Sequence, residues 1–304
     1  MVLRALTTAL LIAFTSFQTT SGTPPQTPPA QNADQQNIPA NELVRAAVQN
    51  ELNAIDNDHT HWMYRLETRK AGATETKELV ETPNGNLMCL IARNGQPLGP
   101  DEQKQEDANL QKFISDTGAQ QKQRRELDED EKKTKDLIAM LPDALTYTYA
   151  GRDGNNTKLA FQPNPNFHPP SREAHVFHAM EGQLVIDTKE HRLVEFSGHL
   201  IHPVKFAGGL LGDLQEGGTF DVRQQQVGTG HWEISLLKVD IKGRALFFKT
   251  IDVQQDETRS NFKRVPDGLT LARAQDVVKK PQASPVISNP VAESPLSPRT
   301  SYPR

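Results

Sequence analysis

The sequence has very little cysteine and no long apolar segment. Cys89 is the one cysteine in 304 residues, so no disulfide can form within the chain. Its neighbours Met88, Leu90 and Ile91 are apolar, which favours a buried, inert thiol over a nucleophile. The longest apolar run, residues 5–17, is shorter than the roughly 20 residues that a membrane-spanning helix needs. We therefore expect a fold that depends on its hydrophobic core and does not span a membrane.

The chain also lacks a surplus of basic charge and the common catalytic motifs. Its formal net charge is −4, with acids and bases interspersed, which excludes the basic footprint of a nucleic-acid-binding protein. There is no GxSxG elbow, phosphate-binding P-loop, dinucleotide fingerprint or HExxH zinc motif. These absences predict a protein that is not an enzyme and that needs no cofactor or metal.

Both ends of the chain differ in composition from the middle. Residues 1–21 have one early charge, an apolar stretch and then small residues, which is the pattern of a signal peptide. Residues 22–40 form a Pro/Gln-rich linker, and residues 278–304 a Pro/Ser-rich tail that we expect to be disordered. Residues 41–277 remain for a single domain. The sequence thus predicts a periplasmic or secreted protein, which we expect to be monomeric.

Residues 218–253 predict the strands around which the domain is organised. The segment indicates three consecutive antiparallel strands with glycine-containing turns, and it places one of those turns at Lys242-Gly243. Apolar residues change parity along the second strand, which predicts either a bulge or burial of both faces. The residues that show this change are Trp232, Ile234 and Leu236, followed by Leu237, Val239 and Ile241.

The remaining pattern predicts an α+β fold. Asn41 is a suitable cap for a first helix with one apolar stripe, and strands are expected at 62–69, 76–82 and 86–92. A helical insertion follows at 101–145, with a break near Gly118, and strands resume from 145 to 202. Together these segments predict roughly 9–11 mostly antiparallel strands and no alternating strand-helix-strand units.

Two polar segments are candidate interaction surfaces. Residues 124–136 form a charge run on the second inserted helix, and opposite charges three or four residues apart are typical of a solvated helix face. Residues 161–171 form a proline-rich loop that cannot pair regularly in a sheet. The alternative interpretation is that a partner protein docks on these segments. A charged partner would bind the helix, and another partner surface would be the loop.

Residues 182–198, GQLVIDTKEHRLVEFSG, form a strand pair across a polar turn, and the long meander that ends in GRALFFKTIDV follows them. This order of elements resembles the lipoprotein-localisation-factor superfamily, which includes LolA, LolB and RseB. The resemblance implies an incomplete, strongly curved antiparallel half-barrel closed by helices. It also implies an apolar cavity that holds acyl chains.

An apolar wall for such a cavity is available in the sequence. The first helix could supply a lid, and the strands could supply the concave face. The candidate ligand-binding residues are Val44, Val48, Leu52, Leu184, Ile186, Phe196, Trp232, Ile234, Phe247 and Ile251. The same side chains could instead pack against the helices as a dry core, because periodicity does not distinguish a cavity from a filled core.

Three functional hypotheses follow from the sequence. The first is an exported, non-enzymatic binding protein that carries a lipid, a lipoprotein or another acylated ligand. The second is an envelope interaction or sensor module that uses the same fold as a scaffold for a protein partner. The third is a metal-dependent enzyme built on the pairs His175/His178 and His199/His202, of which only the first could share a face, and only on a helix.

Overall fold

The computed structural model describes residues 38–70, 72–206, 212–245 and 249–279. It is an α+β fold in which one antiparallel sheet of 13 strands is not closed into a barrel. The predicted signal peptide at 1–21, most of the linker at 22–40 and the tail beyond 279 lie outside the described residues. The predicted fold class is confirmed.

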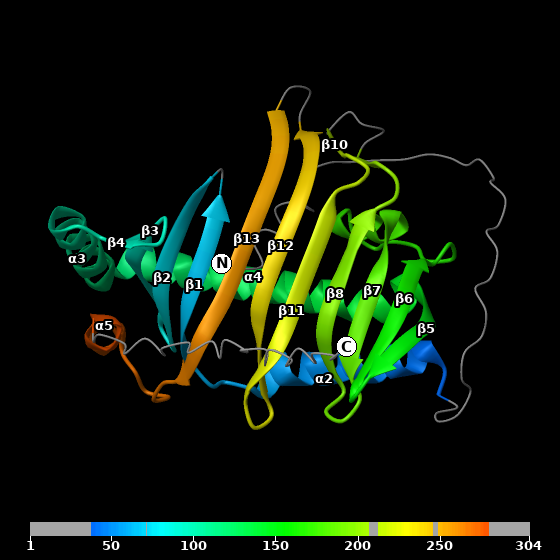
Figure 1. Ribbon diagram of the computed structural model, residues 1–304, viewed down its shortest axis with the longest axis horizontal. Coiled ribbons are helices and arrows are strands. Elements are labelled where there is room, and N and C mark those ends of the chain that lie inside the picture. The colour runs from blue at the N-terminus through cyan, green and yellow to red at the C-terminus, as the bar shows by residue number, and fades with distance from the viewer. Residues whose placement is uncertain (1–37, 71, 207–211, 246–248, 280–304) are drawn as a thin grey trace, which may run out of the picture.

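The meander predicted at residues 218–253 lies at the centre of the sheet (Figure 1). It consists of β11 (Thr219–Gly228), β12 (His231–Ala245) and β13 (Lys249–Arg264). On one side β13 pairs with β1 (Trp62–Lys70), which leads to β2 (Ala73–Thr82), β3 (Gly85–Arg93) and β4 (Gln96–Pro97). On the other side β11 pairs with β8 (Arg192–Leu200), followed by β7 (Met180–Asp187), β6 (Asn156–Pro163) and β5 (Leu145–Asp153).

The parity change in β12 is caused by a bulge. Ile234 pairs with Gln224 and Leu236 pairs with Arg223, so Ser235 is the extra residue. An inserted residue reverses which face the following side chains occupy. The bulge that the sequence offered as one explanation is therefore confirmed.

The turn predicted at Lys242-Gly243 is wrong. Both residues lie inside β12, where they pair with Asp252 and Ile251 of β13. The short strand β10 (Gly212–Leu214) lies against β12 here and pairs in turn with β9 (Val204–Phe206). A Cβ on Gly243 would lie 2.1 Å from the backbone oxygen of Asp213, so the glycine is required by this close approach and not by a turn.

Two helices cross one face of the sheet. They are α2 (Ala40–Asn57) and α4 (Thr117–Ala144), and Figure 1 shows both behind the strands. Asn41 does not cap α2, because it lies within the helix, and its side chain donates a hydrogen bond to the Pro142 backbone oxygen at 3.2 Å. α4 begins after Asp116, whose carboxylate accepts a hydrogen bond from the Ala119 backbone at 2.9 Å.

In the described part of the chain, helices cover the opposite face at the β2–β3 end. Here α3 (Pro100–Ser115) and α5 (Leu271–Lys279) pack on the sheet, and Figure 1 shows both at this edge of it. Met63, Val80 and Leu87 point to these helices, whereas Tyr64 and Leu79 belong to a separate cluster on the face toward α4. This end of the sheet is therefore covered on both faces. The sequence did not predict α5.

The main core lies at the β5–β8 end, where α2, the last turns of α4 and a 3-10 helix, η1 (Glu173–Ala179), pack on the strands. Aromatic rings of Phe161, Phe196 and Phe220 form a row across three strands, with successive centroids 5.1 and 5.0 Å apart. Stacking at this spacing adds to the area that the rings bury. The buried residues of this half form one continuous hydrophobic cluster, which extends to β11 and β12.

A buried ion pair fixes α2 to β8 at the edge of this core. The Glu51 carboxylate accepts hydrogen bonds from Arg192 Nε at 2.8 Å and Nη2 at 3.0 Å. It also accepts one from the Leu193 backbone N–H at 2.8 Å. Arg192 further lies with its guanidinium carbon 5.9 Å from the centre of the Trp232 ring. Helix and sheet are thus joined through a geometrically specific contact.

We expect Gly243→Ala to lower the free energy of unfolding by about 1–3 kcal/mol, because the added Cβ would force β10 away from β12. Gly268→Ala is the matched control, because no atom lies within 4 Å of a Cβ at that position. Urea unfolding of both variants measures the difference. Equal stability of the two variants would contradict the close approach described above.

Glu51→Ala should cost about 3–5 kcal/mol, because it leaves the Arg192 guanidinium buried without its counter-charge. Arg45→Ala on the same helix removes an exposed ion pair with Asp143 and should cost at most about 1 kcal/mol. Denaturant unfolding monitored by circular dichroism gives both values. A Glu51→Ala loss no larger than that of Arg45→Ala would show that the pair does not hold the helix on the sheet.

Candidate functional site

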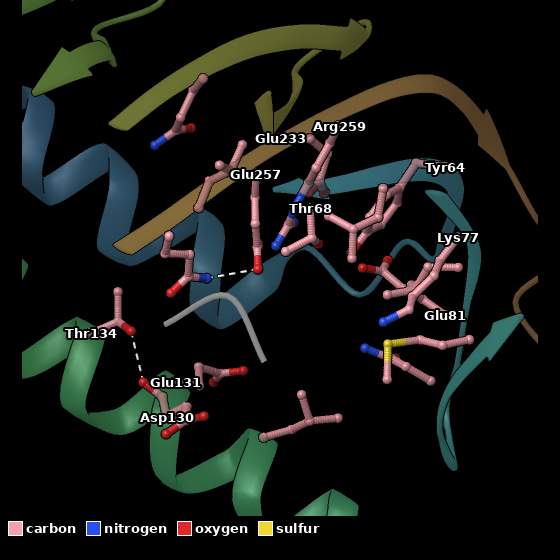
Figure 2. Close-up of a pocket in the computed structure, with 18 of the residues that line it drawn as sticks. Tyr64, Thr68, Lys77, Glu81, Asp130, Glu131, Thr134, Glu233, Glu257 and Arg259 are labelled. Atoms are coloured by element: carbon pink, nitrogen blue, oxygen red, sulfur yellow. Dashed lines mark hydrogen bonds between the residues drawn. The ribbon is translucent and has the colours of Figure 1, made fainter. Parts of the chain in front are cut away.

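A cavity of about 1090 Å³ lies between the sheet and the helices at the end opposite the main core. Its floor is formed by β1, β2, β3, β12 and β13, and α2 and α4 form the opposite wall. Figure 2 shows Asp130, Glu131 and Thr134 of α4 on one side and Tyr64, Glu257 and Arg259 of the sheet on the other. The volume is at the upper end of the range typical of small-molecule sites.

Part of the cavity wall is apolar. Tyr64, Leu66 and Leu79 form a buried cluster on the floor, with Met88 beside them. A smaller hollow of about 260 Å³ between β2, β3 and α4 is lined by Leu79, Met88 and Leu127 as well as by polar residues. It shares these three residues with the main cavity, so the two hollows adjoin. This side of the cavity can accommodate an aliphatic group.

The rest of the wall is charged, with an excess of acids. Ten Asp or Glu residues line the cavity, against five Lys or Arg residues. Several acids are already neutralised: Glu51 pairs with Arg192, and Asp128 accepts a hydrogen bond from Arg124 at 2.9 Å. Asp130 on α4 is only 7% exposed, and its carboxylate makes no hydrogen bond to any residue that the structure describes. The cavity therefore has uncompensated negative charge.

Glu81 and Glu233 lie close enough on the floor to influence each other. Glu81 accepts a hydrogen bond from the Trp62 backbone at 3.0 Å, yet burial raises the pKa of its carboxyl group. Burial, reinforced by the neighbouring Glu81 charge, raises the pKa of Glu233 to about 8. Arg259 opposes this effect but does not cancel it. At neutral pH Glu233 is therefore mostly protonated and can donate a hydrogen bond.

Arg259 and Glu257 line the cavity, and each has a buried side-chain atom without a partner in the described part of the chain. Arg259 Nε and Glu257 Oε2 are buried and have no hydrogen-bond partner among the residues with described positions. Arg259 lies over the Tyr64 ring, with Cζ 5.0 Å from the ring centre. Glu257 Oε1 accepts a hydrogen bond from Gln255 at 2.7 Å, which leaves only Oε2 without a donor. Such atoms are costly unless something else binds them.

The sequence-predicted ligand-binding residues are divided between the core and the cavity. Trp232 and Ile234 line the cavity. Val44, Val48, Leu184 and Ile186 are fully buried in the main core, with Leu52 and Phe196 packed against it. Phe247 lies outside the described residues, and the side chain of Ile251 is not described. Whether any of these residues binds a ligand stays a prediction.

The predicted charge run on α4 is more than a solvated face. Arg124, Asp128 and Glu131 line the cavity together with the buried Asp130. The sequence pattern missed this role because opposite charges at helical spacing look the same toward solvent and toward a wet cavity. It also missed Glu257 and Arg259, because the expected meander ended at Val253 and β13 continues to Arg264.

The other candidate chemical groups lie away from the cavity. His175 and His178 are both on η1, and His199 on β8 lies 3.4 Å from Glu181. Among the residues that the structure describes, no group of three or more His, Cys, Asp or Glu side chains could hold a metal ion. Cys89 is buried on the face toward α3 and α5, and burial raises the pKa of its thiol to about 11.

Comparisons with known proteins identify similar folds only. No family model and no curated protein matches the chain. A structure from Vibrio parahaemolyticus, described as an outer membrane lipoprotein-sorting protein domain, is 9% identical and covers 77% of this chain and 98% of its own, with a TM-score of 0.31. A DUF1329 family protein from Desulfovibrio piger is 11% identical and covers 79% and 99%, with a TM-score of 0.28.

The first of these structures is described as a lipoprotein-sorting domain, and the sequence resemblance also named lipoprotein-localisation proteins. The TM-scores of both structures are too low to support any inference about what this chain binds. The functional proposals below therefore rest on the residues of this chain.

The stability of the protein should depend on pH through Glu233. Its folded-state pKa of about 8 lies above the ordinary value of 4.5, so the folded protein retains a proton that the unfolded chain releases between these pH values. Stability contributed by this group is therefore lost as pH rises from about 4.5 to 8. We expect Glu233→Gln to unfold with a flatter pH profile and to be more stable than the wild type at pH 8, by up to about 4 kcal/mol.

Urea unfolding at a series of pH values from 5 to 9 tests this expectation. Glu42→Gln is the matched control, because Glu42 is exposed on α2 and does not line the cavity. The interpretation fails if Glu233→Gln and Glu42→Gln follow the wild-type profile equally closely.

Proposed function

We propose that this chain is an exported, non-enzymatic binding protein that holds a lipid or another acylated ligand between its sheet and its helices. The observation that carries this proposal is the cavity of about 1090 Å³ at the β1–β3 end. The sequence left open whether the interior is a cavity or a packed core. Among the described residues a buried core lies beside this cavity, and the proposal places the ligand in the cavity.

The buried clusters can supply the stability that an open cavity does not. An open cavity forfeits the dispersion contacts and burial that stabilise a protein interior. The main core, with its row of three phenylalanine rings, and the α3–α5 cluster on the other face both lie outside the cavity. Stability can therefore come from these two clusters while the cavity stays available for a ligand.

The cavity wall suits an amphiphile better than a purely apolar molecule. Moving an acyl chain out of a bilayer requires about 0.8 kcal/mol per methylene, so a long chain needs a binding surface worth on the order of 10 kcal/mol. Tyr64, Leu66, Leu79 and Met88 provide apolar contacts for the chain. The charged side of the cavity, with Glu233, Glu257 and Arg259, would contact the polar end of the same molecule.

The cellular site proposed for this role is the periplasm or the extracellular space. It rests on the signal-peptide pattern at residues 1–21, which lie outside the described residues. Within the part of the chain whose structure is described, no helix has the length and apolar character needed to cross a membrane. Lipid or lipoprotein is the proposed partner, and the protein is proposed to act as a monomer.

The non-enzymatic part of the proposal is supported by the chain's one thiol. Cys89 is buried on the sheet face opposite the cavity, and with a pKa of about 11 its thiol is protonated at neutral pH. A protonated thiol is a poor nucleophile. The thiol therefore takes no part in chemistry in the cavity.

Native mass spectrometry of the gently purified mature domain tests the proposal, followed by solvent extraction and identification of lipids. We expect a stoichiometric lipid mass that disappears on extraction. A protein that remains ligand-free when lipids are offered would contradict the proposal.

Blocking the cavity should reduce the bound fraction. Ile234→Trp places a larger side chain in the cavity wall and should lower lipid occupancy roughly tenfold, since it fills space that the ligand needs. Ser235→Trp is the matched control, because Ser235 is the next residue of β12 and does not line the cavity. Equal occupancy of both variants in native mass spectra would place the ligand elsewhere.

A further inference from the structure

Arg259 is a buried cation of the cavity wall with an unpaired atom. It is only 8% exposed, and its Nε atom has no hydrogen-bond partner among the described residues. The Tyr64 ring, 5.0 Å from Cζ, attracts the cation, and the charge of Arg259 lowers the pKa of Glu81 and Glu233, but none of these groups accepts a hydrogen bond from Nε. A buried guanidinium normally has a carboxylate or phosphate partner.

The neighbouring acids do not fill this role. Glu233 is mostly neutral at pH 7 because burial raises its pKa to about 8. Burial also raises the pKa of Glu81, whose carboxylate accepts a hydrogen bond from the Trp62 backbone. Glu257 is held on its other side by Gln255 at 2.7 Å. Arg259 Nε is thus without an acceptor among the described residues.

Glu257 has the opposite requirement. It is 8% exposed, and its Oε2 atom is buried without a donor. Thr68 and Leu66, which pair with Glu257 and Arg259 across the β1–β13 ladder, also line the cavity. The cavity has an excess of acids, and Asp130 faces it from α4 (Figure 2). This position favours a cationic hydrogen-bond donor.

Glu257 and Arg259 are close enough together for one lipid headgroup to contact both side chains. Residues two apart on a strand lie on the same face, and their Cα atoms are about 7 Å apart. An ethanolamine phosphodiester carries an anion and an ammonium group separated by two carbons, so it can reach both side chains. The apolar cluster of Tyr64, Leu66 and Leu79 lies on the same floor and can contact the acyl part of the molecule.

We propose that the cavity selects amphiphiles with a zwitterionic phosphate–amine headgroup, with Arg259 binding the phosphate and Glu257 binding the ammonium group. This inference rests on the proposed lipid-binding function and specifies the ligand class. Anionic lipids that lack the amine would satisfy Arg259 but leave Glu257 unpaired. Such a loss of one charged partner in a buried site reduces affinity substantially.

Isothermal titration calorimetry with short-chain lipids below their micelle concentrations tests the proposal. The probes are dihexanoyl phosphatidylethanolamine, dihexanoyl phosphatidylglycerol and soluble O-phosphoethanolamine. We expect the wild-type chain to bind the ethanolamine lipid at least tenfold more tightly than the glycerol lipid. Equal affinity for the two lipids would overturn the headgroup assignment while leaving lipid binding itself intact.

Variants assign the two positions. Glu257→Gln should abolish the preference for the ethanolamine lipid, whereas Arg259→Gln should weaken both lipids tenfold or more. Arg259→Lys keeps the positive charge but lacks the guanidinium N–H groups. It replaces Arg259→Gln in this test if Arg259→Gln does not fold. Asp256→Asn is the matched control: it lies next to Glu257 but does not line the cavity, so it should retain the wild-type preference.

The remaining outcomes are equally decisive. Retention of the headgroup preference by Glu257→Gln would exclude Glu257 as the ammonium site. If O-phosphoethanolamine binds as tightly as the lipid, the acyl chains contribute nothing to affinity. The site would then be one for the small zwitterion, and the assignment of an amphiphilic ligand would be overturned. If no lipid binds and native mass spectra show none, the proposed function itself fails together with this inference.

Discussion

The contact between Glu51 and Arg192 decides where the helix layer approaches the sheet and where it does not. On one side of this ion pair, α2 and the end of α4 pack directly on β5–β8. On the other side α4 continues toward β3, the last residues of α2 reach the edge of the cavity, and the space between helices and sheet is open. Glu51 and Arg192 also line the cavity, so the pair marks the boundary between the solid and hollow halves.

This arrangement explains why the cavity is polar on one side. Arg192 contacts Trp232, and Glu51 is held by four hydrogen bonds, so these charges are satisfied within the protein. Further along the floor, Arg259 and Glu257 each have a side-chain atom without a partner among the described residues, and burial raises the pKa of Glu81 and Glu233. The charged groups near Glu51 are thus paired, whereas those a few strands away are only partly so. A ligand would contribute most where the protein itself contributes least.

The sequence predicted most of the elements but not the space between them. Alternating and helical patterns identified the strands and the helices α2, α3 and α4, because each buries one regular face. The Lys242-Gly243 turn was wrong because a glycine required by a close backbone approach has the same sequence signal as a turn glycine. α5 was missed because its short apolar stripe directly precedes the proline-rich tail.

The site was only partly predictable for a related reason. Periodicity assigns a side chain to a face, but it does not give the distance to the element opposite. Val44 and Leu184 therefore looked the same as Trp232 and Ile234, although the first two lie in the solid core and the last two line the cavity. Buried charges such as Arg259 give no apolar signal, and their burial depends on pairing between strands far apart in the chain.

That long-range pairing has a consequence for how the chain folds. Trp62 near the start of the domain pairs with Arg264 near its end, so β1 has no partner on one edge until some 200 later residues are available. The cavity floor combines β1, β2 and β3 with β12 and β13, and α5 covers the other face of β2 and β3 last of all. Non-local pairing of this kind slows folding. The cavity is therefore completed only when nearly the whole domain has been synthesised.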